Sequence, residues 1–274
     1  MKYVISYSSG GLGNRMLPLG SILSLKDKHD IIPGVVWDST LRCGALFNDI
    51  FQTSIKTFLL KDLPLEETVI FSNPGWIQHD LNLNGNSALS ELSQKVPVLP
   101  LESLNSPNFT KKYSVIYHNT FFVSEAELID GLKELTPTNN IIQSVNDFCS
   151  SNNIDKQTIG VHARGTDFMN PNFDPYLNQI GQLVSEGKKI FLCSDVSEWE
   201  YRALELYPNN IIIRSNKSKL KKHNENSSWV NNVLTTKENT IDGMIDLLIL
   251  NRCDVQIYDS YSTFAFLAKN IKYE

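Results

Sequence analysis

The sequence contains little cysteine and no long hydrophobic run. Its four cysteines are far apart among 274 residues, and none stands at the Cys-x-x-Cys spacing that is typical of zinc sites. No stretch approaches the roughly 20 apolar residues of a membrane-spanning helix, and the first residues lack the basic-then-apolar pattern of a secretory signal peptide. We therefore expect a cytoplasmic protein without a transmembrane segment. Cys193 and Cys253 lie in apolar runs and are expected to be buried free thiols.

An excess of positive charge is also missing. The formal net charge is −5, whereas dedicated nucleic-acid-binding proteins usually carry a basic excess. The basic run at 217–223 stands among Ser and Asn, and we expect a solvated loop there. Hydrophobic residues make up 41% of the sequence and charged residues 20%, which is typical of soluble globular proteins.

The sequence does have a repeated alternation of short apolar strands and amphipathic helices. Segment 2–7 predicts a strand, followed by a glycine turn and a helical pattern from about 16 to 28. From residue 157 onward the alternation is regular. Strands are expected at 158–163, 189–193, 211–214 and 255–258, and helices at 175–186 after an Asp174 N-cap, 198–207, 238–250 and 262–269. This pattern predicts a parallel sheet with helices on both faces.

Ligands of such sheets bind at the carboxyl ends of the strands, and the first polar group at such an end is His162-Ala163-Arg164-Gly165-Thr166-Asp167. Strand alternation puts His162 and Arg164 on one face, and the Arg164 guanidinium can bind two phosphate oxygens. Gly165 would let the backbone approach a ligand closely. Asp167 can orient Arg164 or meet a sugar hydroxyl, and an Arg–Asp ion pair without a ligand is the alternative.

The second polar group, 259–263, leaves a strand and opens a helix. Ser260, Ser262 and Thr263 offer hydroxyls beside the free N–H groups of the helix N-terminus, which is a natural site for an anion. Plain N-capping by Ser260 or Ser262 is the simpler interpretation, and the two are compatible.

The third group is Ser194-Asp195, again at a strand end. Its carboxylate can bind the N1–H and 2-amino donors of guanine or a ribose hydroxyl, and it can also cap the following helix. Asp246, inside the helix before the last strand, can reach a base as well, although a lone helical Asp more often faces solvent.

The glycine turn Gly10-Gly11-Leu12-Gly13-Asn14 follows the first strand and can cradle a diphosphate. It lacks the Lys-Ser/Thr ending of a P-loop, which disfavours ATP or GTP hydrolysis. Met16 also departs from the dinucleotide-binding pattern, which has a small residue there.

Together these motifs resemble the fucosyltransferase superfamily, which includes α1,2-, core α1,6-, nodulation and protein O-fucosyltransferases. Segment 10–16 resembles the family's Gly-Gly-Leu-Gly-Asn-Gln-Met type motif, and 161–167 resembles its His-x-Arg-x-x-Asp motif. Segment 191–195 resembles its strand ending in Ser/Thr-Asp, and 246–262 resembles its closing helix, strand and Ser-rich turn. The middle of the chain, about 37–157, shows no matching motif.

The resemblance implies an α/β protein of the GT-B fold, with two Rossmann-like domains whose parallel sheets carry helices on both faces. Residues 1–135 would form the acceptor-side domain and 136–274 the nucleotide-sugar-binding domain. It implies an inverting transfer of fucose from GDP-fucose to an acceptor hydroxyl on a glycan or glycoconjugate. No cofactor and no essential metal are expected.

Position by position, the resemblance implies that Arg164 holds the β-phosphate, with help from Ser262 and Thr263. The catalytic residues would be Arg164, Asn14 and Asp167, the last as general base in preference to Asp174. The full donor-binding set is Gly11, Leu12, Gly13, Asn14, His162, Arg164, Ser194, Asp195, Asp246, Ser260, Ser262 and Thr263.

Two departures from the family pattern leave alternatives open. Gly165 stands where many relatives carry a second basic residue, and Arg15 stands where Gln is common, so either can change the donor or the acceptor. One alternative is a GT-B transferase that uses another nucleotide-sugar. The other is a non-catalytic nucleotide- or sugar-binding module of the same fold, which the retained Arg164, Asn14 and Ser262 make less attractive.

Overall fold

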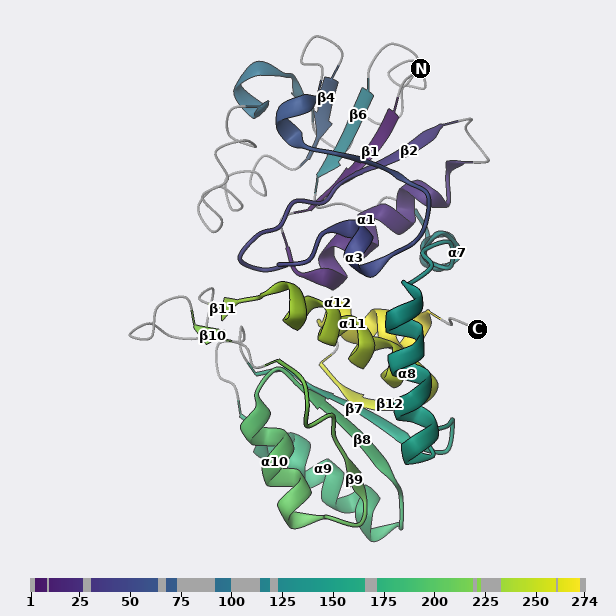
Figure 1. The fold of residues 1–274 in the computed structure, drawn as a ribbon, viewed down its shortest axis with the longest axis vertical. Coiled ribbons are helices and arrows are strands. Elements are labelled where there is room, and N and C mark those ends of the chain that lie inside the picture. Colours follow the sequence, from purple (N-terminus) through teal and green to yellow (C-terminus); the bar gives the residue numbers. More distant parts are fainter. Residues whose placement is uncertain are drawn as a thin grey trace. The chain divides into compact units, whose positions relative to one another are not determined.

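The chain divides into two compact units, Met1–Pro137 and Thr138–Glu274, which are drawn together in Figure 1. Each unit is built around its own sheet. The computed structural model describes residues 3–8, 10–26, 31–63, 68–72, 92–99, 114–118, 123–165, 172–218, 221–222, 233–259 and 261–271.

Within its described residues, the first unit contains a six-stranded parallel sheet of order β3-β2-β1-β6-β4-β5. The strands are β1 (Tyr3–Tyr7), β2 (Ile32–Val36), β3 (Lys56–Phe58), β4 (Thr68–Phe71), β5 (Val98–Leu99) and β6 (Ser114–His118). The helices are α1 (Leu12–Leu23), α3 (Phe47–Ile50), the 3₁₀ turn η1 (Leu60–Asp62) and α7 (Glu125–Leu132). Because β2 and β6 flank β1, the order of the strands reverses at β1, and the glycine turn leaves its carboxyl end.

Helix α1 packs closely on α7, and glycines make this contact possible. A Cβ on Gly131 would overlap the backbone carbonyl of Gly20, so neither helix can carry a side chain there. A buried cluster of apolar side chains from β1, β2, β4 and β6 forms a core of this unit, and Ile5, Ile70 and Ile116 are fully buried in it.

Within its described residues, the second unit contains a four-stranded parallel sheet of order β12-β7-β8-β9. Its strands are β7 (Ile159–Ala163), β8 (Ile190–Ser194), β9 (Ile211–Ile212) and β12 (Asp254–Tyr258), and β10 (Lys221–Lys222) pairs antiparallel with β11 (Val233–Leu234). The helices are α8 (Asn139–Asn152), α9 (Asp174–Ser185), α10 (Ser197–Leu206), α11 (Lys237–Arg252) and α12 (Thr263–Asn270).

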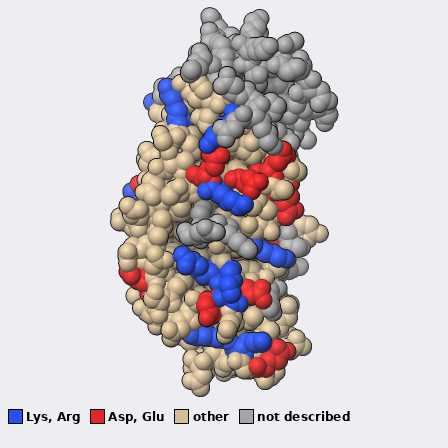
Figure 2. Space-filling model, turned by 90° about the vertical axis from the view of Figure 1, so that its right-hand side faces the viewer, with Lys and Arg blue, Asp and Glu red and all other residues tan. Residues whose placement is uncertain are grey.

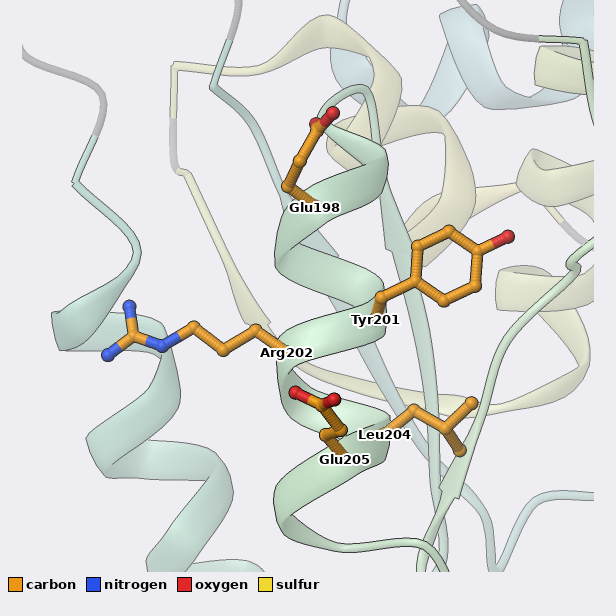
Figure 3. Close-up of a pocket in the computed structure, with 5 residues that line it drawn as sticks. All are labelled: Glu198, Tyr201, Arg202, Leu204 and Glu205. Atoms are coloured by element: carbon orange, nitrogen blue, oxygen red, sulfur yellow. The ribbon is translucent and has the colours of Figure 1, made fainter.

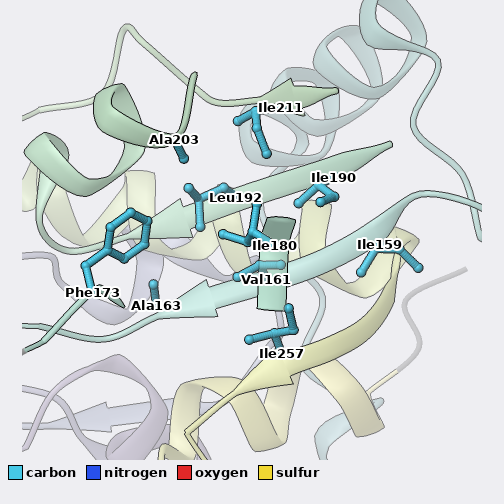
Figure 4. Packing of buried hydrophobic residues seen from close by; sticks show 10 residues of the cluster. All are labelled: Ile159, Val161, Ala163, Phe173, Ile180, Ile190, Leu192, Ala203, Ile211 and Ile257. Carbon is cyan, nitrogen blue, oxygen red and sulfur yellow. The ribbon is translucent and has the colours of Figure 1, made fainter. Parts of the chain in front are cut away.

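Alternation along β7 and β8 divides their side chains between two helical layers. Val161 and Leu192 point into a core that α9 and α10 cover through Ile180 and Ala203 (Figure 4). The intervening residues face the opposite layer, where the Phe191 ring lies 5.9 Å from that of Phe148 on α8 and His162 and Cys193 meet α12 and α11. The expected parallel sheet with helices on both faces is therefore confirmed for this unit.

Several boundaries differ from those predicted. Helix α1 begins at Leu12, directly after the glycine turn and not at 16. Phe173 is the N-cap of α9, and Asp174 is its first residue, so Asp174 is not the predicted cap. Strand β9 ends at Ile212, which leaves Arg214 outside the sheet.

All four cysteines are buried and free, as the apolar runs around Cys193 and Cys253 predicted. On the face drawn in Figure 2, Lys and Arg side chains are interspersed with Asp and Glu, so this face presents charges of both signs. Among the described residues, no helix has both the length and the apolar character needed to cross a membrane.

Candidate functional site

The predicted strand-end residues meet in one cavity of the second unit. Strands β7, β8 and β9 follow one another across the sheet, and β12 then pairs with the other edge of β7. The strand order therefore reverses between β7 and β12, where ligands of parallel sheets bind. A cavity of about 140 Å³ opens here, and its lining includes the predicted residues His162, Arg164, Ser194, Asp195 and Asp246.

Whole sites for small ligands usually occupy about 300–1,000 Å³, so a cavity of 140 Å³ is smaller than a whole site of this kind. Two of the predicted residues, Asp167 and Ser260, lie outside the described residues. Both are close in sequence to strand ends that border the cavity, and their roles stay predictions.

The ends of β7, β8 and β12 converge on the phenol of Tyr176 in α9. Burial raises the pKa of Tyr176, a hydrogen bond with the backbone of Arg164 opposes the rise, and the carboxylates of Asp259 and Asp195 add to it. One side chain thus interacts electrostatically with all three predicted strand-end groups.

Gly165 has a packing role that the sequence did not predict. A Cβ at this position would lie 2.6 Å from both the Trp199 ring and the Val196 side chain of the segment that opens α10. The Gly165 N–H donates to Asp195 Oδ1 at 2.7 Å. Glycine is therefore required because α10 lies against the backbone here, and a larger basic residue would not fit without movement.

Asp195 ties β8 to β7 and does not cap the following helix. The N-cap of α10 is Val196, without a side-chain cap, and the Val196 N–H donates to Ser194 Oγ at 3.0 Å. The capping interpretation of Asp195 is therefore wrong. Its hydrogen bond to Gly165 instead fixes the carboxylate beside Arg164, on the cavity wall.

The start of α12 contributes an aromatic wall and a capped helix N-terminus. The His162 ring stacks on Phe264 with centroids 4.8 Å apart. Ser262 caps α12, and its Oγ accepts from Ala265 N at 3.3 Å, so the capping interpretation is confirmed for Ser262. Ser262 and Thr263 stand at the carboxyl end of β12 but are not among the residues that line the cavity.

Asp246 lies in a buried cluster of five charged side chains, which we call the Asp246 network. The members come from α10, α11 and the segment after β9. Asp246 Oδ1 accepts from Arg214 Nη1 at 2.8 Å, and Oδ2 accepts from Lys217 Nζ at 3.3 Å. Arg214 also pairs with Asp242 at 2.6 Å, and Lys217 also pairs with Glu200. The Asp246 side chain is only 5% exposed, so the solvent-facing interpretation of this helical Asp is wrong.

Burial and pairing set the protonation of the network. Burial raises the pKa of Glu200 to about 7, although Lys217 acts in the opposite direction. Burial also acts to raise the pKa of Asp246, but the charges of Lys217 and Arg214 lower it overall. For Lys217, burial favours the neutral amine, and Asp246, with Glu200, raises the pKa overall. Asp246 is thus ionised and Lys217 protonated at neutral pH.

Lys217, which lines the cavity, and Arg214, which pairs with Asp242 and Asp246, are charged residues that the sequence interpretation missed. The run at 217–223 was expected to be a solvated loop, but the Lys217 side chain is only 12% exposed and lines the cavity, so that expectation is wrong for Lys217. No periodic pattern marks these cations. The only available signal was their position just after a strand of the parallel sheet. The other lining residues that were not predicted are Cys193, Ser197, Ser218, Asn239, Asp242, Gly243 and Phe264.

The glycine turn and Asn14 belong to the first unit. Asn14 is exposed in the first turn of α1, and a Cβ on Gly10 would lie 2.7 Å from the Asn14 Cβ. Gly10 thus leaves room for the Asn14 side chain. Gly11 is the N-cap of α1, and Leu12 and Gly13 are buried in its first turn.

Arg15 holds the glycine turn from within the first unit. Its side chain is almost fully buried, with an exposed fraction of 2%. It donates from Nε to the Gly10 carbonyl at 2.8 Å, from Nη1 to the Asp38 carbonyl at 2.6 Å and from Nη2 to Thr40 Oγ1 at 2.9 Å. The guanidinium also lies 5.4 Å from the centre of the Trp37 ring. Arg15 is therefore a structural clamp between this turn and the segment after β2.

A second cavity, of about 420 Å³, shares no lining residue with the first. All five of its lining side chains, among them Glu198, Tyr201 and Arg202, project from α10 (Figure 3). Arg202 pairs with Asp174 at 3.0 Å, and its side chain is 53% exposed. None of the predicted residues lines this cavity. Among the described residues, no group of three or more His, Cys, Asp or Glu side chains is arranged to hold a metal ion.

Solved structures of fucosyltransferases are among those with a similar fold. NodZ α-1,6-fucosyltransferase co-crystallised with GDP superposes with a TM-score of 0.61 and 14% identity over 98% of this chain and 92% of that chain. NodZ from Bradyrhizobium gives the same values, and POFUT1 in complex with GDP-fucose gives 0.55 and 15% identity over 98% and 93%. No protein-family model and no curated protein sequence matches this chain. The structural likeness confirms the expected α/β fold, which this chain shares with these fucosyltransferase structures.

Proposed function

We propose that the protein is a fucosyltransferase that takes fucose from GDP-fucose and transfers it to a hydroxyl of a glycan or glycoconjugate. One observation carries the proposal: His162, Arg164, Ser194, Asp195 and Asp246, named from the sequence as donor-binding residues, line one cavity at the point where the strand order reverses. The fold supports it further, because structures of this fold have been solved with GDP and with GDP-fucose.

The donor would lie across the carboxyl ends of β7 and β12. Arg164 would hold the β-phosphate, and the N-terminus of α12, with Ser262 and Thr263, would add hydrogen-bond donors on the other side. The guanosine would occupy the described cavity, between the His162–Phe264 pair and the Asp246 network. Asn14 and the glycine turn would contribute from the first unit.

In the proposed reaction the acceptor oxygen attacks the anomeric carbon on the face opposite GDP. The new carbon–oxygen bond forms as the bond to the β-phosphate oxygen breaks, and GDP leaves with the electron pair. Arg164 stabilises the charge that builds on the diphosphate. The acceptor proton passes to a carboxylate, for which we propose Asp167. Configuration at the anomeric carbon is inverted, and the scheme uses no metal.

Calorimetric titration with GDP, UDP and ADP, with and without EDTA, tests the donor assignment. We expect selective binding of GDP that EDTA does not change. Preference for UDP would favour a GT-B transferase of another nucleotide-sugar, and absence of nucleotide binding would contradict the proposal. Binding of GDP without transfer to any acceptor would favour the non-catalytic module.

Arg164→Ala extends this test to the diphosphate. We expect GDP affinity to fall at least about tenfold, the loss typical of a hydrogen bond to a charged group, and donor turnover to fall by roughly 10²–10³. Arg202→Ala is the matched control, because Arg202 lies in the same unit, outside this cavity, and makes only an exposed ion pair. Equal effects of the two substitutions would contradict the role of Arg164.

A further inference from the structure

Lys217 has no hydrogen-bonding capacity left for a ligand. Its Nζ donates to the Ser194 carbonyl at 3.2 Å, to Asp246 Oδ2 at 3.3 Å and to the Glu200 carboxylate. A lysine ammonium carries three N–H donors, so each of them has a protein acceptor. These acceptors lie on β8, α11 and α10, and Lys217 therefore joins three elements around the cavity.

Asp246, in contrast, can still accept a further hydrogen bond. An ionised carboxylate offers about four acceptor positions, two on each oxygen. Oδ2 accepts from Lys217 and from the Cys193 thiol, whose Sγ lies 3.4 Å away. Oδ1 accepts from Arg214 at 2.8 Å. Both positions on Oδ2 are thus occupied, and one position on Oδ1 remains.

Because both acceptor positions on Oδ2 are occupied, Asp246 can accept fewer hydrogen bonds from a purine base. Guanine carries two adjacent donors, N1–H and the 2-amino group, and a carboxylate can accept both when one donor meets each oxygen. Hypoxanthine offers N1–H alone. Because Oδ2 has no position left, Asp246 can accept one hydrogen bond from the base but not the pair.

We infer that Lys217 is a specificity-determining residue: by occupying Asp246 Oδ2, it limits Asp246 to a single hydrogen bond with the base, so that Asp246 does not distinguish 6-oxopurine nucleotides of the guanine type from those of the hypoxanthine type. The inference rests on the proposed function, since it assigns the base to this cavity. Lys217 is held in place because it compensates two buried carboxylates, Glu200 and Asp246.

The unaltered protein supplies the first test, by titration with GDP and with inosine diphosphate. We expect the two dissociation constants to agree within about tenfold, because a recognised 2-amino group would be worth roughly tenfold or more. A larger preference for GDP overturns the inference and leaves the proposed function standing. Absence of binding of either nucleotide overturns both.

A pair of variants supplies the second test. Glu200→Gln with Lys217→Met removes the ammonium together with the carboxylate that would be left unpaired, and Asp246 keeps Arg214. Glu200→Gln alone is the matched control. We expect the preference for GDP over inosine diphosphate to rise about tenfold in the double variant relative to the control, because Oδ2 becomes available to the 2-amino group. A general loss of structure would weaken both nucleotides alike, so an unchanged preference overturns the inference.

Discussion

At the scale of single residues, Gly165 shows how one position can satisfy packing and site geometry together. The sequence suggested that this glycine lets the backbone approach a ligand. The structure instead places Trp199 and Val196 where a side chain would be, and the Gly165 N–H binds Asp195. The absence of a basic residue here is therefore explained by the position of α10.

Gly165→Ala should lower the free energy of unfolding by about 1–3 kcal/mol, because the added methyl overpacks a filled site. The contact atoms, at 2.6 Å, belong to Val196 and to Trp199, whose ring stacks on the buried Phe173 with centroids 5.1 Å apart. Urea unfolding measures the change.

Gly243→Ala is the control for this prediction, since the nearest atom to its added Cβ is 4.0 Å away, in Phe264. Replacing a glycine inside α11 should raise stability by about 0.5–1 kcal/mol. Equal stability changes for the two substitutions would contradict the packing role of Gly165.

Prediction of the site from sequence succeeded where a residue's place in a strand determines its surroundings. His162 lies near the end of a five-residue buried strand and Arg164 directly follows it, so topology alone brings them to the cavity beside Asp195. Lys217 and Arg214 lie in an irregular segment, where no periodicity indicates burial. Their positions depend on the carboxylates of α10 and α11, which are distant in the sequence.

At the scale of elements, the glycine turn depends on Arg15, which joins it to the segment after β2. Arg15→Gln would remove hydrogen bonds to the Gly10 and Asp38 carbonyls, because the glutamine side chain is shorter and has one amide group. We expect a loss of about 2–3 kcal/mol in the free energy of unfolding, from buried acceptors left without donors.

Chemical denaturation measures the free energy of unfolding of Arg15→Gln and of a control variant, Lys133→Gln. Lys133 carries the same charge in the same unit, but its side chain is 51% exposed and makes only an ion pair with Asp130. The control should change stability by no more than about 0.5 kcal/mol. Similar stabilities for the two variants would show that Arg15 is not a clamp.

The elements themselves were predictable in proportion to their length. Three strands of five residues, β7, β8 and β12, were expected within one residue of their observed bounds, because apolar residues predominate in β7 and β8 and alternate with polar residues in β12. The apolar segment 47–60 has no clear helix or strand pattern in the sequence, and the structure places the short α3, β3 and the start of η1 there. Short elements form through neighbours that are distant in the sequence, and local pattern cannot specify them.

At the scale of the whole molecule, the fold persists at 14–16% identity to its structural neighbours, and no family model matches the sequence. Alternation of short apolar strands with amphipathic helices, repeated along the chain, is enough to specify parallel sheets with covering helices. Identity can therefore fall while the architecture is kept. The chemistry then depends on the few residues at the strand ends, and for this reason the function is argued from the cavity and not from the fold.

The stability of the molecule should depend on pH through Glu200. Its pKa is about 7 in the folded protein and 4.5 as the ordinary value, so folding takes up a proton between these limits. A carboxyl with a raised pKa stabilises the folded state less as pH rises, because the unfolded state then binds fewer protons than the folded state. The contribution lost between about pH 4.5 and pH 7 is roughly 3 kcal/mol.

Urea unfolding of the unaltered protein and of Glu200→Gln at pH 5, 6, 7 and 8 isolates this effect, since all other titrating groups are common to both. We expect the stability of the unaltered protein, relative to the variant, to fall across this range, and a constant difference would show that Glu200 is ionised throughout.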